Sequence, residues 1–240
     1  MTPSETMRTI HFYFDYISSN AYLAWVRLQQ LAEPYRLRIE PVPVLFAALL
    51  EAHAQVGPAE VRPKAHWMSR NNLRKAALLG VPLRPPVHHP FNPLLALRVS
   101  SLELPAPERA ALVGALFRAV WVDRLHVSEP EVVMEVAAGT GLAGAELVRR
   151  AGLPETKQQL RARTQTAIEA GVFGVPTCEL AGELFFGFDD LPYLEMVLAG
   201  NDPLDPEALA EWQAGAPDPS AMRRRFRETP PASWKPGAGS

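Results

Sequence analysis

A serine between a predicted strand and a predicted helix is the first residue whose position suggests chemistry. Ser18 follows residues 9–14, an alternating run rich in β-branched and aromatic residues that predicts a buried strand. Apolar residues at helical spacing then predict a helix that begins near Ser19. The first turn of a helix leaves backbone N–H groups unpaired, and these groups favour an anion. The Ser18 hydroxyl could therefore donate to a thiolate or oxyanion held by those amides.

The same serine also has a purely structural interpretation. Ser, Asp and Asn residues before a helix are ordinary N-caps, and each stabilises its helix by roughly 1 kcal/mol. Residues 15–20 contain several such side chains. The residues taken alone favour capping over catalysis, and both interpretations stay open at this point.

The order of the predicted elements indicates which fold must position Ser18. A second strand is predicted over residues 36–44, where Pro41 and Pro43 favour a strand end or an edge position. Near the other end, a β-hairpin of residues 177–180 and 183–186 precedes a helix over residues 191–199. The predicted helices between these two groups cover residues 45–54, 63–79, 94–102, 107–124, 129–139, 143–151 and 153–170. This order predicts an α/β fold, a thioredoxin-like core split by a large all-helical insertion.

These elements divide the chain into three predicted parts. Residues 8–44 and 161–200 form the thioredoxin-like domain, and residues 45–160 form the helical insertion domain. Residues 201–240 are rich in proline and contain an arginine run at 223–225. We expect this C-terminal tail to be loosely ordered.

Composition and charge exclude several classes of function. The chain has 240 residues, enough for a sizeable core, and its net charge of −2 offers no basis for binding nucleic acid or an acidic membrane surface. Its single cysteine, Cys178, allows neither an intramolecular disulfide nor a multi-cysteine metal site, and we expect it to be buried. The adjacent His88 and His89 point in different directions, so no metal is predicted. Without a signal peptide or an apolar run of roughly 20 residues, a cytoplasmic location is expected.

Four stretches, in order along the chain, carry a resemblance to a known family. They are Phe-Asp-Tyr-Ile-Ser at 14–18, Pro-Ala-Glu-Val at 58–61 followed by a lysine, Pro-Phe-Asn-Pro-Leu-Leu-Ala-Leu-Arg at 90–98, and Gly-Val-Phe-Gly-Val-Pro-Thr at 171–177 with Phe-Gly-Phe-Asp at 186–189. Together they resemble the 2-hydroxychromene-2-carboxylate isomerases and the kappa-class glutathione transferases. Both groups belong to the DsbA-like branch of the thioredoxin superfamily.

The resemblance implies a serine-based site. Ser18 falls where redox relatives carry the attacking cysteine, and without a C-x-x-C motif disulfide exchange through this loop is chemically unavailable. Val175-Pro176 stands where thioredoxin-like proteins carry a cis-proline, so we expect a cis bond there. A cis bond would leave the Val175 N–H and C=O free to pair with glutathione.

Further site residues are implied only by the resemblance. Besides Val175 and Pro176, the implied glutathione-binding residues are Gln55, Lys64 and Asp189, and the implied substrate pocket contains Tyr16, Trp67 and Asn92. Lys64 is equally interpretable as an ordinary surface residue. The chain departs from the family at Phe188 and Asp190, and a second carboxylate beside Asp189 is expected to repel a glutathione carboxylate. Either Asp190 turns to solvent while Lys64 or another cation binds that carboxylate, or the thiol is not glutathione.

The implied activity is isomerisation in aromatic catabolism. The resemblance predicts a cytoplasmic, homodimeric, glutathione-dependent isomerase of the 2-hydroxychromene-2-carboxylate type, which acts on a small aromatic-degradation intermediate by reversible thiol addition. A kappa-like glutathione transferase or peroxidase is one alternative. A non-catalytic thioredoxin-like binding protein is another.

Overall fold

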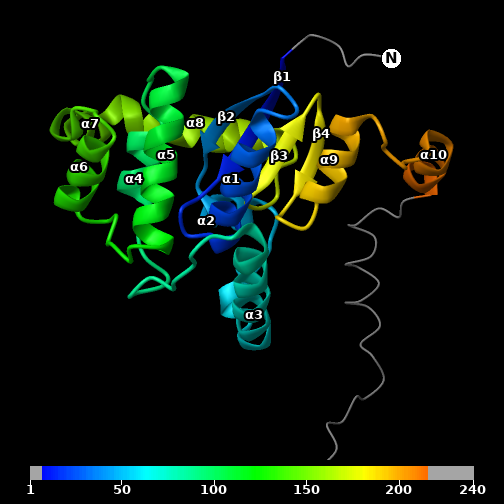
Figure 1. The fold of residues 1–240 in the computed structure, drawn as a ribbon, viewed down its shortest axis with the longest axis horizontal. Helices are drawn as coiled ribbons and strands as arrows, with labels where there is room; N and C mark the ends of the chain where they lie inside the picture. Colours follow the sequence, from blue (N-terminus) through cyan, green and yellow to red (C-terminus); the bar gives the residue numbers. More distant parts are fainter. Residues whose placement is uncertain (1–6, 216–240) are drawn as a thin grey trace, which may run out of the picture. The chain divides into compact units, whose positions relative to one another are not determined.

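A four-stranded mixed sheet forms the centre of the structure, a computed structural model that describes residues 7–215 (Figure 1). The strands are β1 (Arg8–Phe14), β2 (Leu37–Pro43), β3 (Thr177–Leu180) and β4 (Glu183–Phe186), in the order β2-β1-β3-β4. β1 and β2 are parallel, whereas β1 pairs with β3, and β3 with β4, in antiparallel register. The proline-containing strand β2 lies at the edge of the sheet, which is one of the two positions that its prolines predicted.

The strand β1 separates two hydrophobic clusters. Ile10, Phe12 and Phe14 belong to a large cluster, and Tyr13 belongs to a small one. Successive side chains of a strand point to opposite faces of the sheet. One face is therefore covered mainly by α1 (Ser19–Ala32), α5 (Ala106–Trp121) and the helices beside them. The other face is covered by α2 (Phe46–Ala52) and α8 (Pro154–Glu169).

The helical segments between β2 and β3 follow the predicted pattern to within a few residues. The helix α3 (Arg62–Leu79) is followed by Gly80, which adopts the left-handed conformation with φ of 68° and so provides the predicted helix stop. A short 3₁₀ turn over Pro58–Glu60 was not predicted. The other helices of this segment are α2 (Phe46–Ala52), α3 (Arg62–Leu79), α4 (Leu94–Ser100), α6 (Pro130–Gly139), α7 (Gly144–Ala151) and α8 (Pro154–Glu169).

The chain after β4 completes the fold. The helix α9 (Leu191–Ala199) contacts β4, and both the hairpin and this helix are confirmed at their predicted positions. The DsbA-like thioredoxin fold with a helix-rich segment between its two halves is thus the observed architecture. The predicted boundaries between the thioredoxin-like domain and the helical insertion remain predictions, since β2, α2 and α8 contact one another across them.

The first part of the C-terminal tail is more ordered than predicted. The chain after Gly200 forms a separate unit, and in its described part, residues 201–215, Pro206–Gly215 is a helix, α10. A proline at the first helical position and a run of good helix formers after it explain this helix. The arginine run at 223–225 lies outside the described residues.

Candidate functional site

The turn between β1 and α1 is the centre of the candidate site. Ser18 is the N-cap of α1, and its Oγ accepts a hydrogen bond from the Ala21 N–H at 3.1 Å. A hydroxyl oxygen that accepts this bond still has its own proton to donate, and no acceptor for that proton lies among the described residues. Capping by Ser18 and donation to a ligand are therefore compatible, so the two interpretations of this serine do not exclude each other.

Backbone donors flank the Ser18 hydroxyl. Within residues 7–215 the backbone N–H groups of Ser19 and Asn20, in the first turn of α1, have no hydrogen-bond partner. Such groups, aligned with the dipole of a 14-residue helix, favour an anion. The arrangement can hold a thiolate or an oxyanion between two amides and one hydroxyl.

The buried carboxyl group of Asp15 is hydrogen-bonded to backbone groups through both of its oxygens. Asp15 accepts hydrogen bonds from the N–H groups of Ile17 and Phe46, both at 3.1 Å. Burial raises the pKa of the Asp15 carboxyl to about 6, although its backbone hydrogen bonds lower it in part. Asp15 thus joins the Ser18 turn to the start of α2.

Two ring nitrogens from the helical segment bind the carbonyls that precede Ser18. The indole N–H of Trp121 donates to the Tyr16 carbonyl at 2.9 Å, and His89 Nε2 lies 3.0 Å from the Ile17 carbonyl oxygen. These bonds fix two consecutive peptide groups of the turn. The sequence analysis did not assign His89 to the site.

The Val175-Pro176 peptide bond is cis, as predicted. Because β1 and β3 pair with Tyr13 opposite Thr177, Pro176 lies next to the end of β1, where the Ser18 turn begins. The N–H and C=O of Val175 make no hydrogen bond within the described part of the chain. A second cis bond, His89-Pro90, was not anticipated.

A buried lysine on α3 is the principal residue that sequence reasoning missed. Lys75 Nζ donates to Asp189 Oδ2 at 2.9 Å and to Asn20 Oδ1 at 3.1 Å, and it lies 5.0 Å from the centroid of the Phe188 ring. One turn earlier, Asn72 Nδ2 donates to Ser19 Oγ at 2.7 Å. The helix α3 thus binds the two polar side chains at the start of α1, Ser19 and Asn20.

The signal that could have identified this contact lies in the spacing along α3. Asn72, Lys75, Ala76 and Leu79 recur at intervals of three and four residues, which defines one helix face. All four are buried or half-buried. Asn72 and Lys75 are polar residues on a buried helix face, and such residues need hydrogen-bond partners on the element against which the face packs.

The structure places the substrate-pocket residues differently from expectation. Tyr16 has no exposed surface; its ring packs against Phe14 and Phe117, and its hydroxyl lies 2.6 Å from Ser100 Oγ. This aromatic side chain therefore belongs to the core. Trp67 is 57% exposed on α3.

Three other expected residues lie on exposed segments. Gln55 follows α2, Lys64 lies in the first turn of α3, and Asn92 precedes α4. Asn92 Oδ1 accepts a hydrogen bond from the Leu94 N–H at 3.0 Å. None of the three makes a side-chain hydrogen bond to the Ser18 turn among the described residues.

The carboxylates of Asp189 and Asp190 have different partners. Asp189 faces Lys75, whereas Asp190 Oδ2 accepts a hydrogen bond from the Phe186 N–H at 2.9 Å. The cation beside Asp189 is thus Lys75 and not Lys64.

The rest of the described chain, residues 7–215, offers no metal centre and no membrane-spanning helix. No group of three or more His, Cys, Asp or Glu side chains in this range could hold a metal ion. No described helix has the length and apolar character needed to cross a membrane. Cys178 is buried as expected, and burial raises the pKa of its thiol to about 12.

The chain is similar in sequence to two groups of known enzymes. Residues 9–199 match the family model of the DSBA-like thioredoxin domain. A 2-hydroxychromene-2-carboxylate isomerase from Sphingobium xenophagum is 32% identical over 195 residues, which cover 80% of this chain and 98% of that protein. Glutathione S-transferase kappa 1 from Homo sapiens is 23% identical over 80% of this chain and 91% of its own length.

A solved structure agrees with these similarities. The selenomethionine structure of a 2-hydroxychromene-2-carboxylate isomerase superposes with a TM-score of 0.75 and 26% identity. The match covers 88% of this chain and 100% of that one. The similarity therefore extends over the whole fold and is not confined to the Ser18 turn.

Proposed function

Because the chain belongs to the DSBA-like thioredoxin domain family and is an enzyme of its isomerase and transferase group, we propose that it is a glutathione-dependent isomerase. We propose that its substrate is a small aromatic-degradation intermediate of the 2-hydroxychromene-2-carboxylate type. The observation that carries this proposal is the free Ser18 hydroxyl proton beside two unpaired amides at the start of α1.

The chemistry follows from stabilisation of a thiolate. A free thiol has a pKa of roughly 8.5, so little thiolate exists at neutral pH. The two amides, the Ser18 hydroxyl and the helix dipole favour the thiolate, and each unit by which they lower the thiol pKa corresponds to about 1.4 kcal/mol. The thiolate adds to a conjugated carbon of the substrate, allows bond rotation or ring opening, and then leaves.

Disulfide chemistry is not part of this proposal. The chain has one cysteine, Cys178, which is buried in β3, and its Ser18 turn contains no thiol. A single buried thiol cannot form the dithiol pair that disulfide exchange requires. Glutathione therefore serves as the nucleophile in the reaction and not as a reductant of the protein.

The remaining contacts are assigned to the peptide part of glutathione. The unpaired N–H and C=O of Val175, before Pro176, suit a peptide ligand that extends β3. Asp189 and Lys75 form a pair of opposite charges that suits the zwitterionic α-amino acid end of glutathione. Gln55 and Lys64 remain in the proposal as contacts supported by the resemblance alone.

Assembly and location complete the proposal. We assign the protein to the cytoplasm and to a homodimer, as the resemblance implies. Size-exclusion chromatography with light scattering measures the dimer directly. A monomer would remove that part of the proposal and leave the chemistry unaffected.

The decisive experiment follows one substrate with and without thiol. We expect the purified protein to convert 2-hydroxychromene-2-carboxylate into an isomer of the same mass only when glutathione is present. The similarity to kappa-class transferases supports a second candidate, for which mass spectrometry would instead detect a stable thioether. No conversion together with no retention on immobilised glutathione would refute both.

A further inference from the structure

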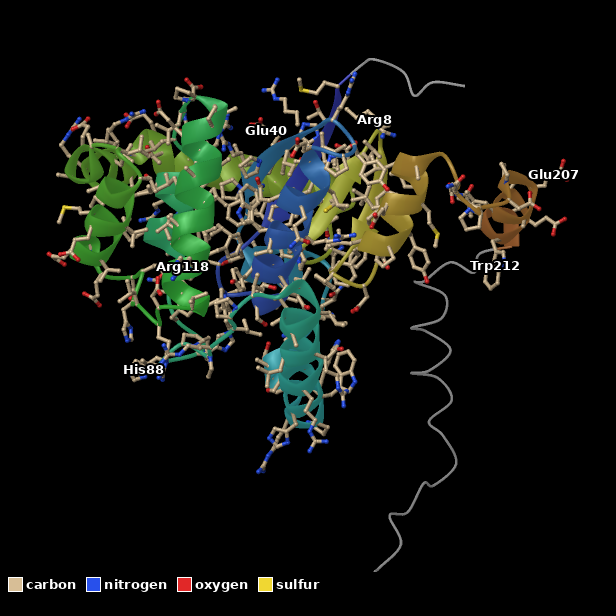
Figure 2. The ribbon with its side chains drawn as sticks, in the orientation of Figure 1. Arg8, Glu40, His88, Arg118, Glu207 and Trp212 are labelled. Atoms are coloured by element: carbon tan, nitrogen blue, oxygen red, sulfur yellow. The ribbon has the colours of Figure 1, made fainter. Side chains whose placement is uncertain are left out.

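Two adjacent histidines in the connection between α3 and α4 have different surroundings. The His88 ring lies 5.1 Å from the His126 ring, whereas the His89 ring lies 5.9 Å from Trp121 and 6.2 Å from Phe91. Figure 2 labels His88 in this connection and Arg118 on the nearby helix α5. Only the second histidine of the pair reaches the Ser18 turn, through the Ile17 carbonyl.

Several hydrogen bonds fix the connection that carries His89. The Arg84 N–H donates to the Trp121 carbonyl at 2.7 Å, and Arg124 Nε donates to the Pro85 carbonyl at 3.0 Å. The Tyr22 hydroxyl donates to the Pro82 carbonyl, also at 3.0 Å. The position of His89 is therefore set by α1 and by the end of α5.

The bond to Ile17 determines the tautomer of His89. A carbonyl oxygen only accepts hydrogen bonds, so Nε2 of His89, 3.0 Å away, must carry the proton. A neutral imidazole with a proton on Nε2 has a lone pair on Nδ1. Nδ1 has no partner among residues 7–215, and the side chain is exposed. His89 can thus accept a proton on Nδ1 without losing its bond to the turn.

This arrangement has the features of an oriented general base. The imidazole is held on one nitrogen by the residue directly before Ser18, and its other nitrogen is free. Histidine is the side chain most often used to transfer protons near neutral pH, and a second hydrogen bond commonly fixes its orientation. The structure thus presents a hydroxyl donor on the turn, Ser18, and a proton acceptor, His89, that is hydrogen-bonded to the residue before it.

Building on the proposed function, we infer that His89 is the proton-transfer residue of this enzyme. As the S–H bond of glutathione breaks, its proton binds Nδ1 of His89 and the electron pair stays on sulfur. Sulfur then forms a C–S bond while the π electrons of the substrate double bond move to its carbonyl oxygen. After bond rotation these electrons return, the C–S bond breaks, and the thiolate regains its proton from His89. No oxidant or reductant is consumed.

Other titratable groups surround His89 and must be separated from it. The turn contributes a carboxyl, Asp15, whose pKa burial raises to about 6. Titratable and charged residues at or beside the contacts of the His89 segment include Asp15, Tyr16, Tyr22, Arg84, His88, Arg118, Asp123, Arg124 and His126.

The test compares three variants across pH, with kcat/KM for glutathione-dependent isomerisation as the first readout. We expect His89→Gln to lower kcat/KM about 10²-fold or more at neutral pH and to abolish the acidic limb of the profile. His88→Gln removes the same group one residue away and should stay within about twofold of the unmodified enzyme. Asp15→Asn should keep the acidic limb. An acidic limb that survives in His89→Gln and disappears in Asp15→Asn would overturn the inference.

A second readout is independent of turnover. Nitrogen-15 NMR of the His89 imidazole reports which nitrogen carries the proton, and we expect the Nε2–H tautomer in the neutral protein. Addition of glutathione should shift the His89 titration and leave that of His88 in place. Bound glutathione with an unshifted His89 titration would overturn the inference alone. Failure of the unmodified protein to bind glutathione would overturn the proposed function and this inference with it.

Discussion

The helical segment contacts the Ser18 turn from two sides, and the two sides differ in chemistry. Before Ser18, the Trp121 indole and the His89 imidazole bind consecutive backbone carbonyls. After Ser18, Asn72 and Lys75 bind the side chains of Ser19 and Asn20. The first side fixes the backbone with ring nitrogens, whereas the second brings a formal positive charge to the helix start.

On the side of the turn that carries Lys75, the two charged partners differ in their exposure to solvent. The Lys75 side chain is 7% exposed, whereas that of its partner Asp189 is 69% exposed. Asn20, Asp189 and the Phe188 ring together offset the cost of burying the ammonium. Removal of Asp189 would leave a buried charge with one fewer partner, but removal of Lys75 would leave only a solvated carboxylate. The lysine can therefore be tested without unfolding the protein.

Removal of the Ser18 hydroxyl should have the largest effect, because both sides of the turn meet there. We expect Ser18→Ala to lower turnover by roughly 10²–10³-fold, the scale of losing one oxyanion-type donor. The same change removes the N-cap bond and should lower the free energy of unfolding by about 1 kcal/mol. Steady-state kinetics and urea unfolding measure the two losses separately.

Two further substitutions at this position distinguish the hydroxyl from the cap. Glycine is tolerated at an N-cap at a cost of only a few tenths of a kcal/mol, so Ser18→Gly should lose activity and little stability. Ser18→Thr keeps the hydroxyl and should retain most of both. If activity instead followed stability across the three variants, Ser18 would act only as a cap.

Asp15 joins the turn to α2 and should produce a pH dependence of stability. Its carboxyl has a pKa of about 6 in the folded protein against an ordinary value of 3.8. The folded state therefore binds more protons between these values, and its stability falls as pH rises through this window by about 3 kcal/mol. We expect this fall to be absent in Asp15→Asn.

Urea unfolding at several pH values between about 4 and 7 provides the measurement. The asparagine variant also loses one acceptor, because its amide offers one oxygen to the two N–H groups that Asp15 now binds. That loss, about 1–3 kcal/mol, is independent of pH. Glu131→Gln, which neutralises an exposed carboxylate on α6, serves as the control and should follow the unmodified protein. Parallel curves for Asp15→Asn and the unmodified protein would contradict the assignment.

Local patterns in the sequence were sufficient to predict most of the fold. The strand at residues 9–14, the helix start at Ser19 and the hairpin after Pro176 all depend on nearby residues. The helix α10 was missed because the proline and glycine content of the tail outweighed a short run of helix formers. The Val175-Pro176 bond was predicted from the resemblance and not from any local propensity.

The site was harder to predict, because it depends on contacts between distant segments. Lys75 and Asp189 are 114 positions apart, and His89 and Ile17 are 72 apart. The resemblance pointed to Lys64, which is exposed, whereas the packing of α3 on α1 brings Lys75 to the site. Tyr16 lies next to the reactive turn in sequence, but its ring turns into the core. The resemblance therefore pointed to a residue that belongs to the core.

The charged side of the turn is tested through ligand affinity. We expect Lys75→Met to weaken glutathione binding about tenfold, or about 1.4 kcal/mol, because one charge-assisted partner of the ligand is lost. The free energy of unfolding should change by less than about 1 kcal/mol, since the remaining carboxylate is exposed. Isothermal titration calorimetry measures the affinity.

Arg74→Gln offers a matched control for this substitution. Arg74 precedes Lys75 and is exposed on α3, so the variant removes the same charge without removing a contact in the site. Its dissociation constant should stay within about twofold of the unmodified value. Equal weakening by both variants would indicate a general effect of net charge and would remove Lys75 from the proposed glutathione site.

The smallest effect is expected at Asp190. The sequence predicted that its carboxylate, beside that of Asp189, would repel a carboxylate of glutathione. Its Oδ2 accepts the Phe186 N–H and is already partly compensated, and Lys75 offsets the charge of Asp189 next to it. Asp190→Asn keeps an acceptor for Phe186 and removes only the charge. Because partly exposed charges interact by about 0–1 kcal/mol, glutathione should bind no more than about fivefold tighter. Any gain should shrink as ionic strength rises, since salt screens such pairs. A gain that is larger or independent of salt would place Asp190 in direct contact with the ligand.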